Sequence, residues 1–337
     1  IMILKDEKKL DPSYIPSKIL CREEEIKRIK NLIKGGKVLI SGGVGTGKTM
    51  IARYIGGDAY VNCYINRTEH RVLEEILKQI KPRFNPSGLP TQELWNEIDG
   101  KRIIIDEIDG MDLNELKHFT YTLSRQRELG KRIDYIAITR SYVILKQMLD
   151  EATWSTFAQN SVVELKPYSW EQMKEILYSR AIESLNSNCY DDEIISLIAE
   201  IAIRSPGHAR TGILLLLNSS LIADAKMHKK IEAEDVREAN REEIFFDLNE
   251  MEKEELLLLL SVASACMNKA YASYEEIKER FIVRSEEYGA EINEKKFEKI
   301  FKKLLGIDLI NEGKYGYTIL NFPANLLIKE IEKIISK

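Results

Sequence analysis

The chain has 337 residues, which is too long for one small hydrophobic core, so we expect two or three domains. Its 50 lysines and arginines against 54 aspartates and glutamates leave a net charge of -4, so any DNA contact must come from local basic patches. No apolar run approaches the roughly 20 residues that cross a bilayer, so no membrane partner is expected. The four dispersed cysteines form no CxxC pair, which favours reduced thiols in a cytoplasmic protein over a zinc site or a disulfide framework.

The first half of the chain alternates short apolar runs with helical patterns. The periodicity predicts strands over 37–41, 59–62, 102–106, 135–139 and 162–166. Helices are predicted over 22–34, from Lys48, and over 67–80, 112–129 and 142–150. Strands that alternate with helices in this way form a parallel sheet covered on both faces, so the fold class is α/β.

From Ser169 onward the strands stop. Helices are predicted over 169–186, 191–204, 208–225 and 232–240, and the segment 241–250 joins them to a third region. That region has helical patterns at 251–266, 273–282 and 293–305, followed by two β-like runs at 307–311 and 315–322, as in a winged helix-turn-helix. The expected division is a tail at 1–15, a nucleotide-binding base at 16–167, a helical lid at 168–248 and a winged helix at 249–337.

A glycine-rich loop follows the first predicted strand. Gly42 to Thr49 matches G-x-x-x-x-G-K-[ST], whose backbone N–H groups surround phosphate oxygens at the start of a helix. Lys48 can reach the β- and γ-phosphates of ATP or ADP, and the Thr49 hydroxyl can ligate Mg²⁺. A chance glycine turn is the alternative, but the strand before the loop and the helix after it favour phosphate binding.

The run "RIIIDE" supplies two carboxylates at the end of a buried strand. In a parallel sheet this end lies beside the phosphate loop, so Asp106 is expected to hold Mg²⁺ and Glu107 to polarise the attacking water. Together with Lys48, Glu107 is the predicted catalytic residue. Two acids that merely cap a strand are the alternative, and their position next to the phosphate loop argues against it.

The sheet with a helical lid resembles the AAA+ ATPases. The segments "YIPSKILCREEEI", "YVNC", "IIIDEID", "KPYSWEQMKEILYSR" and "SPGHARTGILLLLNSSLIADA" are similar to the archaeal origin-recognition and cell-division-control family of replication initiators. The resemblance runs from about Tyr14 through the winged helix. It implies an ATP-dependent switch that binds double-stranded origin DNA, with a paralogous initiator subunit and the replicative helicase as partners.

The resemblance also implies roles for individual residues. Pro16 to Arg22 would border the adenine, Tyr168 and Arg180 would contact the nucleotide, and Arg210 would act as the second sensor. Asn62 would orient Glu107. The residues implied around the phosphates are Gly43, Val44, Gly45, Thr46, Gly47, Lys48, Thr49 and Met50. From the sequence pattern alone, Arg180 could equally be a solvated helix charge and Tyr168 a packed aromatic.

The sequence departs from the family pattern at two positions. Arg140 stands where the family has the first-sensor asparagine, and Ala152 stands where it has an arginine offered to a neighbouring subunit. No arginine occurs between Ser141 and Ser179. Because an arginine finger contributes roughly 10³–10⁵ in rate, we expect slow hydrolysis and a long-lived ADP-bound state.

The helix predicted at 293–305 is the main candidate for DNA contact. It places Lys295, Lys299 and Lys302 on one outward face, with Lys296 and Lys303 at its flanks, so the lysines could meet phosphates in a major groove. The wing tip adds Lys314 and Tyr315. Interleaved Glu294 and Glu298 leave a solvated helix as the alternative.

A second candidate for DNA contact is the loop "KPRFNPSGLP" at 81–90. The family carries a DNA-touching insertion in this place, and Arg83 could meet a phosphate. An ordinary surface loop is an equal alternative. Two other readings of the whole chain stay open: a helper AAA+ ATPase of another class, and a weakly catalytic nucleotide-binding subunit that pairs with a paralogous initiator.

Overall fold

The computed structural model describes residues 2–241, 248–290 and 293–336, which form two compact units. One unit, the base, comprises Ser13–Tyr168 with Pro206–His208. The other comprises Ile1–Pro12, Ser169–Ser205 and Ala209–Lys337, so it holds both the lid helices and the C-terminal region. Part of the expected joining segment 241–250, namely 242–247, lies outside the described residues.

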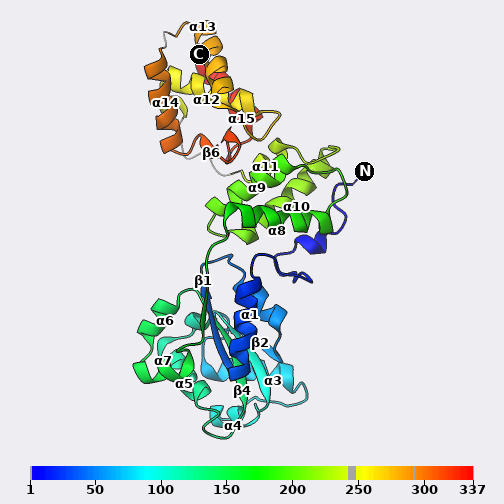
Figure 1. The fold of residues 1–337 in the computed structure, drawn as a ribbon, viewed down its shortest axis with the longest axis vertical. Helices are drawn as coiled ribbons and strands as arrows, with labels where there is room; N and C mark the ends of the chain where they lie inside the picture. Colours follow the sequence, from blue (N-terminus) through cyan, green and yellow to red (C-terminus); the bar gives the residue numbers. More distant parts are fainter. Residues whose placement is uncertain (1, 242–247, 291–292, 337) are drawn as a thin grey trace. The chain divides into compact units, whose positions relative to one another are not determined.

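The base is built on a five-stranded parallel sheet, as the sequence predicts. Its strands are β1 (Lys37–Gly42), β2 (Ala59–Asn62), β3 (Lys101–Asp106), β4 (Ile133–Thr139) and β5 (Val162–Leu165). They lie in the order β2-β3-β4-β1-β5 (Figure 1). The register pairs Asn62 with Asp106, which brings the polar ends of β2 and β3 to the same edge as the phosphate loop after β1.

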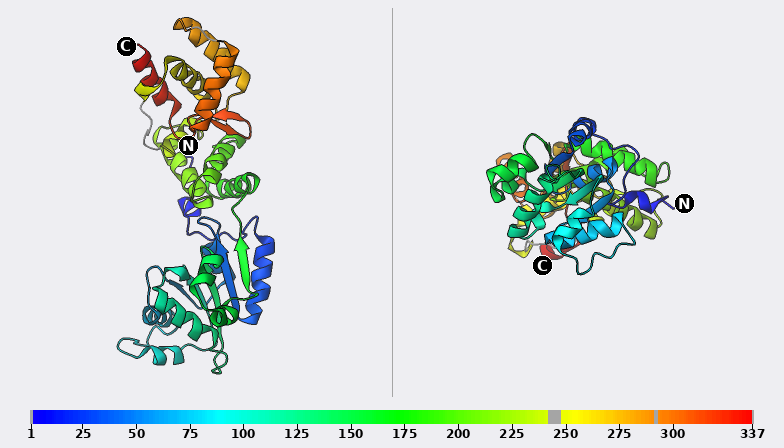
Figure 2. Two further views of the ribbon diagram at one scale, coloured as in Figure 1. Left: turned by 90° about the vertical axis from the view of Figure 1, so that its left-hand side faces the viewer. Right: turned by 90° about the horizontal axis from the view of Figure 1, so that it is seen from below.

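Helices cover both faces of this sheet. Alternate residues of a strand point to opposite faces, so Ile104 packs under α1 (Glu23–Leu32) and α2 (Lys48–Ile55), whereas Ile103 and Ile105 pack on the other side. That second face is covered by α3 (Glu69–Ile80), α4 (Thr91–Asn96), α5 (Leu113–Ser124), α6 (Tyr142–Met148) and α7 (Glu151–Phe157). The left view of Figure 2 shows α1 on one side of the sheet and the helices of residues 113–157 on the other. The base also contains two short 3₁₀ helices, η2 (Ile33–Gly35) and η3 (Ile108–Gly110).

Two of these helices are absent from the sequence-based prediction. α4 is only six residues long, which is too short to show a helical periodicity in the sequence. It also follows the 81–90 loop, whose three prolines and one glycine indicate irregular structure. α7 begins at an Asp150 cap, whose side chain accepts a hydrogen bond from the Thr153 backbone nitrogen. Both helices bury aromatic side chains in the base core, Trp95 from α4 and Trp154 and Phe157 from α7.

The lid consists of α8 (Trp170–Ser184), α9 (Asp192–Arg204), α10 (Ala209–Ala225) and α11 (Ala233–Ala239). The N-terminal segment, which falls in the predicted tail over 1–15, packs on the lid and forms η1 (Glu7–Leu10). The Ile3 backbone nitrogen donates to Asp224 Oδ1 over 2.6 Å, and Leu4 bridges to Leu185. Buried Ile3 and Leu10 supply the apolar anchors of this contact.

The C-terminal region contains α12 (Lys253–Cys266), α13 (Tyr274–Glu287), α14 (Glu294–Gly306) and a hairpin of β6 (Asn311–Gly313) and β7 (Gly316–Thr318). This is a winged helix, preceded by η4 (Leu248–Glu250). The wing is shorter than predicted because Asp308 takes a left-handed φ of 57° and ends α14 in a turn. The unpredicted α15 (Ala324–Ile335) follows Pro323 and packs against α12.

A buried arginine joins the lid to the winged helix. Arg237 of α11 is fully buried and pairs with Glu234 at 2.6 Å. Its guanidinium donates to the backbone oxygens of Cys266 and Ile319 at 2.9 Å and of Ala270 at 3.1 Å. Because carbonyls of the winged helix satisfy most of its donors, the lid and the winged helix form one compact unit.

Candidate nucleotide site and nucleic-acid interface

The phosphate loop follows β1 and depends on glycine at two positions. Gly45 and Gly47 have φ of 72° and 92°, which favour glycine. A Cβ at Gly45 would also lie 2.0 Å from the Gly207 carbonyl oxygen, so no side chain fits there. Glycine at these positions lets the loop backbone turn into the N-terminus of α2, where N–H groups can receive phosphate oxygens.

Lys48 lies within this loop. Its Nζ donates to the carbonyl oxygens of Gly42 and Gly43, each over 2.7 Å. Burial lowers the pKa of Lys48, and the carboxylate of Asp106 acts in the opposite direction. A half-buried ammonium held among carbonyls is suited to a strong anionic partner such as a nucleotide phosphate.

Asp106 is the centre of the hydrogen-bond network at the end of β3. Its buried carboxylate accepts from Thr49 Oγ1 at 2.7 Å, from the Tyr60 hydroxyl at 2.8 Å and from the Glu107 backbone nitrogen at 2.9 Å. The contact between Thr49 and Asp106 brings together the two residues predicted to ligate Mg²⁺. Because Mg²⁺ in nucleotide sites is held by one or two carboxylates together with phosphate oxygens, this donor set fits it.

Tyr60 is a site residue that the sequence analysis missed. Burial raises the pKa of its hydroxyl, so it remains a donor to Asp106 near neutral pH. The guanidinium of Arg53 lies 4.1 Å from the centre of its ring. Its place on β2, next to β3, could have indicated the contact, since neighbouring parallel strands end at the same edge.

Glu107 is held from two sides. It has a left-handed φ of 51°, and its Oε2 accepts from Asn62 Nδ2 at 3.0 Å, as the resemblance implies. Its Oε1 lies 3.6 Å from Nη2 of Arg140, which also lies 5.6 Å from the centre of the Tyr64 ring. The unusual residue at the first-sensor position therefore forms an ion pair with the predicted catalytic carboxylate.

Arg22 links the entry segment to the loop. It is buried, lies 4.0 Å over the ring of Tyr168, and donates to the Lys166 carbonyl oxygen at 2.5 Å. A longer contact of 3.4 Å reaches the Thr46 carbonyl oxygen. Arg22 and Tyr168 thus support each other beside the phosphate loop, and their direct contact with a nucleotide remains a prediction.

The remaining nucleotide candidates fall into two groups. In the base, Pro16 and Met50 are half-buried, Val44 is exposed at the loop tip, and Thr46 is buried with its hydroxyl on the Gly43 carbonyl oxygen. In the lid unit, Arg180 is buried and donates to the Lys9 carbonyl oxygen at 3.1 Å, whereas Arg210 is exposed at the start of α10. The roles of Arg180 and Arg210 toward the nucleotide remain predictions.

The lysines of α14 divide into two sets. Lys296 pairs with Glu254 at 2.5 Å and Lys303 pairs with Glu255, both on α12. Lys295, Lys299 and Lys302 are exposed and have no ion-pair or hydrogen-bond partner among the residues that the structure describes. Only this second set is free to neutralise an external polyanion.

The wing tip contacts the lid. The ring of Tyr315 lies 5.9 Å from that of Trp170 between ring centres, and its hydroxyl accepts a hydrogen bond from Lys174 Nζ at 3.3 Å. Lys314 pairs with Glu171 at 3.0 Å. The two wing residues predicted to touch DNA therefore lie against α8 within their own unit.

The loop at 81–90 offers one open cation. Arg83 is exposed and has no side-chain partner among the described residues, whereas Lys81 pairs with Glu97 at 2.7 Å. Phe84 is partly buried and packs against the base core. None of the helices in the described ranges could span a membrane.

Comparison with known proteins gives consistent matches. Residues 174–241 match the model of the Cdc6 AAA+ ATPase-type lid domain. The chain is 26% identical to "ORC1-type DNA replication protein 1" of Sulfolobus acidocaldarius, over 96% of this chain and 91% of that protein. It is 27% identical to "ORC1-type DNA replication protein 2" of Saccharolobus solfataricus, over 94% and 88% of the two chains.

Solved structures share the fold. Cdc6p from Pyrobaculum aerophilum has a TM-score of 0.86 at 23% identity, with 99% of both chains covered. The Aeropyrum pernix ORC1 protein in complex with DNA has a TM-score of 0.63 at 24% identity, with 100% of this chain and 97% of that chain covered. With the lid-domain match and the near full-length relatives, the AAA+ base, helical lid and winged helix show that this chain belongs to the archaeal Orc1/Cdc6 family.

Proposed function

We propose that this protein is a DNA replication initiator that binds double-stranded origin DNA under the control of a bound adenine nucleotide. One observation carries the proposal: a single chain combines the Lys48–Thr49–Asp106 phosphate site with a winged helix that presents three open lysines on α14. The similarity to proteins named for DNA replication supports it. A paralogous initiator subunit and the replicative helicase are the proposed protein partners.

The residues of the base have separate roles in this proposal. Lys48 would bind the β- and γ-phosphates, and Thr49 with Asp106 would hold Mg²⁺, which supplies charge neutralisation at the phosphates. Glu107, oriented by Asn62, would accept the proton of the attacking water. The Tyr60 hydroxyl donates to Asp106 Oδ2, the same carboxylate oxygen that accepts from Thr49, and so helps to orient this carboxylate.

Footprinting across a replication origin tests the proposal. The wild-type protein with ATP should protect discrete duplex segments, and protection should weaken when Lys295 and Lys299 are replaced by alanine. Substituting Lys27 and Lys30, two exposed lysines on α1, gives a matched control with the same loss of charge. Uniform, sequence-independent protection, or none at all, would support a helper ATPase of another class instead.

A weakly catalytic partner subunit is the second candidate function. It is favoured by the ion pair between Arg140 and Glu107 and by Ala152 in the first turn of α7, where the family pattern has an arginine. Such a subunit would bind ATP and DNA but hydrolyse ATP slowly. Turnover measured alone and with a paralogous initiator separates the two candidates, since a partner subunit gains turnover only in the mixed assembly.

A further inference from the structure

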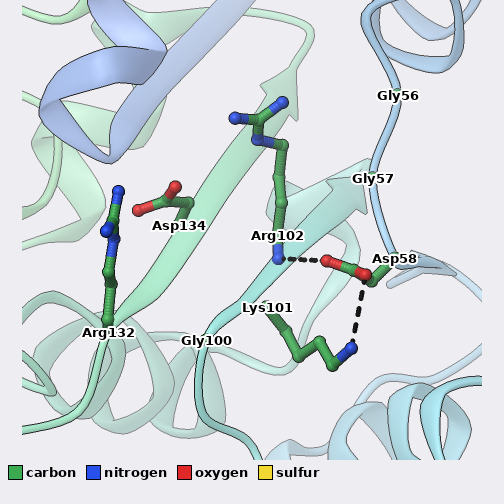
Figure 3. Close-up of a pocket in the computed structure, with 8 residues that line it drawn as sticks. All are labelled: Gly56, Gly57, Asp58, Gly100, Lys101, Arg102, Arg132 and Asp134. Carbon is green, nitrogen blue, oxygen red and sulfur yellow. Dashed lines mark hydrogen bonds and ion pairs between the residues drawn. The ribbon is translucent and has the colours of Figure 1, made fainter.

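We propose a second phosphate-binding site in the base, at the edge of the sheet where β2, β3 and β4 begin. A pocket of about 410 Å³ lies there, between the loops that lead into these three strands. Figure 3 shows the residues that line it, which are Gly56, Gly57, Asp58, Gly100, Lys101, Arg102, Arg132 and Asp134. The proposed ligand is a phosphate group of a nucleic-acid backbone.

This pocket is separate from the nucleotide site. β3 begins at Lys101 in the pocket and ends at Asp106 beside the phosphate loop. Five residue steps of about 3.3 Å put the two ends roughly 17 Å apart. A ligand in the pocket would therefore touch none of the residues proposed to hold ATP, and changes in the pocket should leave nucleotide binding intact.

The carboxylates of the pocket are already engaged. Asp58 Oδ2 accepts from the Arg102 backbone nitrogen at 2.7 Å, and its Oδ1 lies 3.5 Å from Lys101 Nζ. Asp134 pairs at 2.8 Å with Arg127, which lies outside the pocket lining. Both acids thus have cationic partners other than the guanidinium groups of Arg102 and Arg132.

Those two guanidinium groups have no partner within the part of the chain that the structure describes. Among the described residues, neither the Arg102 nor the Arg132 side chain has a hydrogen bond or an ion pair, and Arg102 Nε is buried with no acceptor. Figure 3 shows both side chains extending the same way, on either side of Asp134. A buried guanidinium nitrogen without an acceptor is costly, so the pair is suited to an external anion.

The chemistry of the lining favours a phosphate over other anions. A planar guanidinium fork matches phosphate oxygens, and two such forks with Lys101 provide several charge-assisted donors. An added Cβ at Gly56 or Gly100 would meet no atom within 4 Å, so the backbone lies open to a ligand. The eight lining residues include no aromatic side chain that could stack on a base. The pocket is therefore suited to contact a backbone without reading its sequence.

The size of the pocket also favours a backbone segment. About 410 Å³ is many times the roughly 30 Å³ that a water molecule occupies in the liquid, so the pocket has room for a ligand larger than one small ion. A phosphate with part of its sugar fits this volume. A free phosphate-bearing small molecule shares the same chemistry, and the choice of nucleic acid as the source rests on the proposed function.

The test uses the full chain with Arg102→Gln and Arg132→Gln combined. Fluorescence anisotropy on a duplex at several salt concentrations should show about five- to tenfold weaker binding and a salt slope reduced by about one to two. Arg71→Gln is the control for the loss of one positive charge, because Arg71 is an exposed arginine of the same unit with no side-chain partner among the described residues. Unchanged ADP affinity by calorimetry shows that the double variant is folded, and a variant with lysine at both positions should retain most of the binding.

A second measurement identifies the source of the phosphate. In ¹⁵N-edited spectra the Arg102 Nε–H signal should shift and saturate as inorganic phosphate is added. A saturable shift with unchanged duplex binding would assign the pocket to a free phosphate compound and overturn the nucleic-acid source. Absence of both effects would overturn the site. If Lys295→Ala with Lys299→Ala still weakens DNA binding in that case, the proposed function stands without the pocket.

Discussion

The nucleotide site and the DNA-binding surface were predicted from the same sequence, but their residues differ in how they meet in the structure. At the end of β3, Asp106 contacts Thr49 and Tyr60, and Glu107 contacts Asn62, so the predicted groups form one connected network. In the winged helix the five lysines predicted to contact DNA fall into two sets with different surroundings. Three lysines of α14 stay open, while Lys296 and Lys303 bind carboxylates of α12.

This difference follows from what positions each group. Asp106, Asn62 and the phosphate loop are placed by the backbone of neighbouring parallel strands, whose ends must meet at one edge of the sheet. The lysines are long and flexible, and their partners are decided by whichever acidic side chains pack nearby. A motif on strand ends is therefore a stronger guide to a site than a run of charges on a helix.

The largest expected effect is on nucleotide affinity, in a variant of the phosphate loop. Lys48→Ala should weaken ADP and ATP binding by about a hundredfold or more, because it removes a charge-assisted donor that no other residue in the loop supplies. Isothermal calorimetry measures this, with Lys27→Ala as the exposed control. If Lys48→Ala keeps its nucleotide affinity, the loop at 42–49 does not bind the nucleotide phosphates.

The next prediction tests whether open and paired lysines differ. Lys295→Ala with Lys299→Ala should weaken duplex binding about tenfold at moderate salt and lower the slope of log affinity against log salt by close to two. The matched pair, Lys296→Ala with Lys303→Ala, should change the slope by less than one, because α12 carboxylates already neutralise these charges. Equal effects of the two double variants on duplex binding would contradict the distinction between open and paired lysines on α14.

The third prediction concerns Arg140 and Glu107. Arg140→Asn should raise ATP turnover several-fold, since a carboxylate freed from an ion pair is a better proton acceptor. Glu107→Gln should bind ATP and turn over more slowly than the wild-type protein. Phosphate release measures the ATP turnover of both variants. Arg67→Asn is the control for Arg140→Asn, because it also breaks an exposed ion pair, here with Asp112. A fall in turnover in Arg140→Asn would indicate that Arg140 assists hydrolysis.

The smallest expected effect concerns the wing. Trp170→Ala should tighten duplex binding about two- to threefold, because it removes the ring that Tyr315 packs against on the lid and frees the wing tip for DNA. Tyr178→Ala, which removes an exposed aromatic side chain of α8, is the control. Anisotropy on the same duplex checks both variants, and unchanged or weaker binding would mean that the wing takes no part.

The sequence by itself determined the base and its site in outline. The five apolar strand runs, the glycine loop at 42–49 and the "DE" pair after β3 are local patterns, and a parallel sheet allows few ways to arrange them. Asn62 and Glu107 also came together as the resemblance implies. These predictions needed no knowledge of distant contacts, because the strand runs and the loop chemistry are encoded within short segments.

Tertiary structure decided the features that depend on residues far apart in the chain. The N-terminal segment packs on the lid through Asp224, Arg237 binds carbonyls of the winged helix, and Tyr315 lies on Trp170. The six-residue α4 was missed because it follows a loop rich in proline and glycine, and α15 begins directly after Pro323 and is stabilised by its packing against α12. The partners of Arg140 and of the α14 lysines likewise follow from side-chain packing between elements, which periodicity and spacing along the chain do not record.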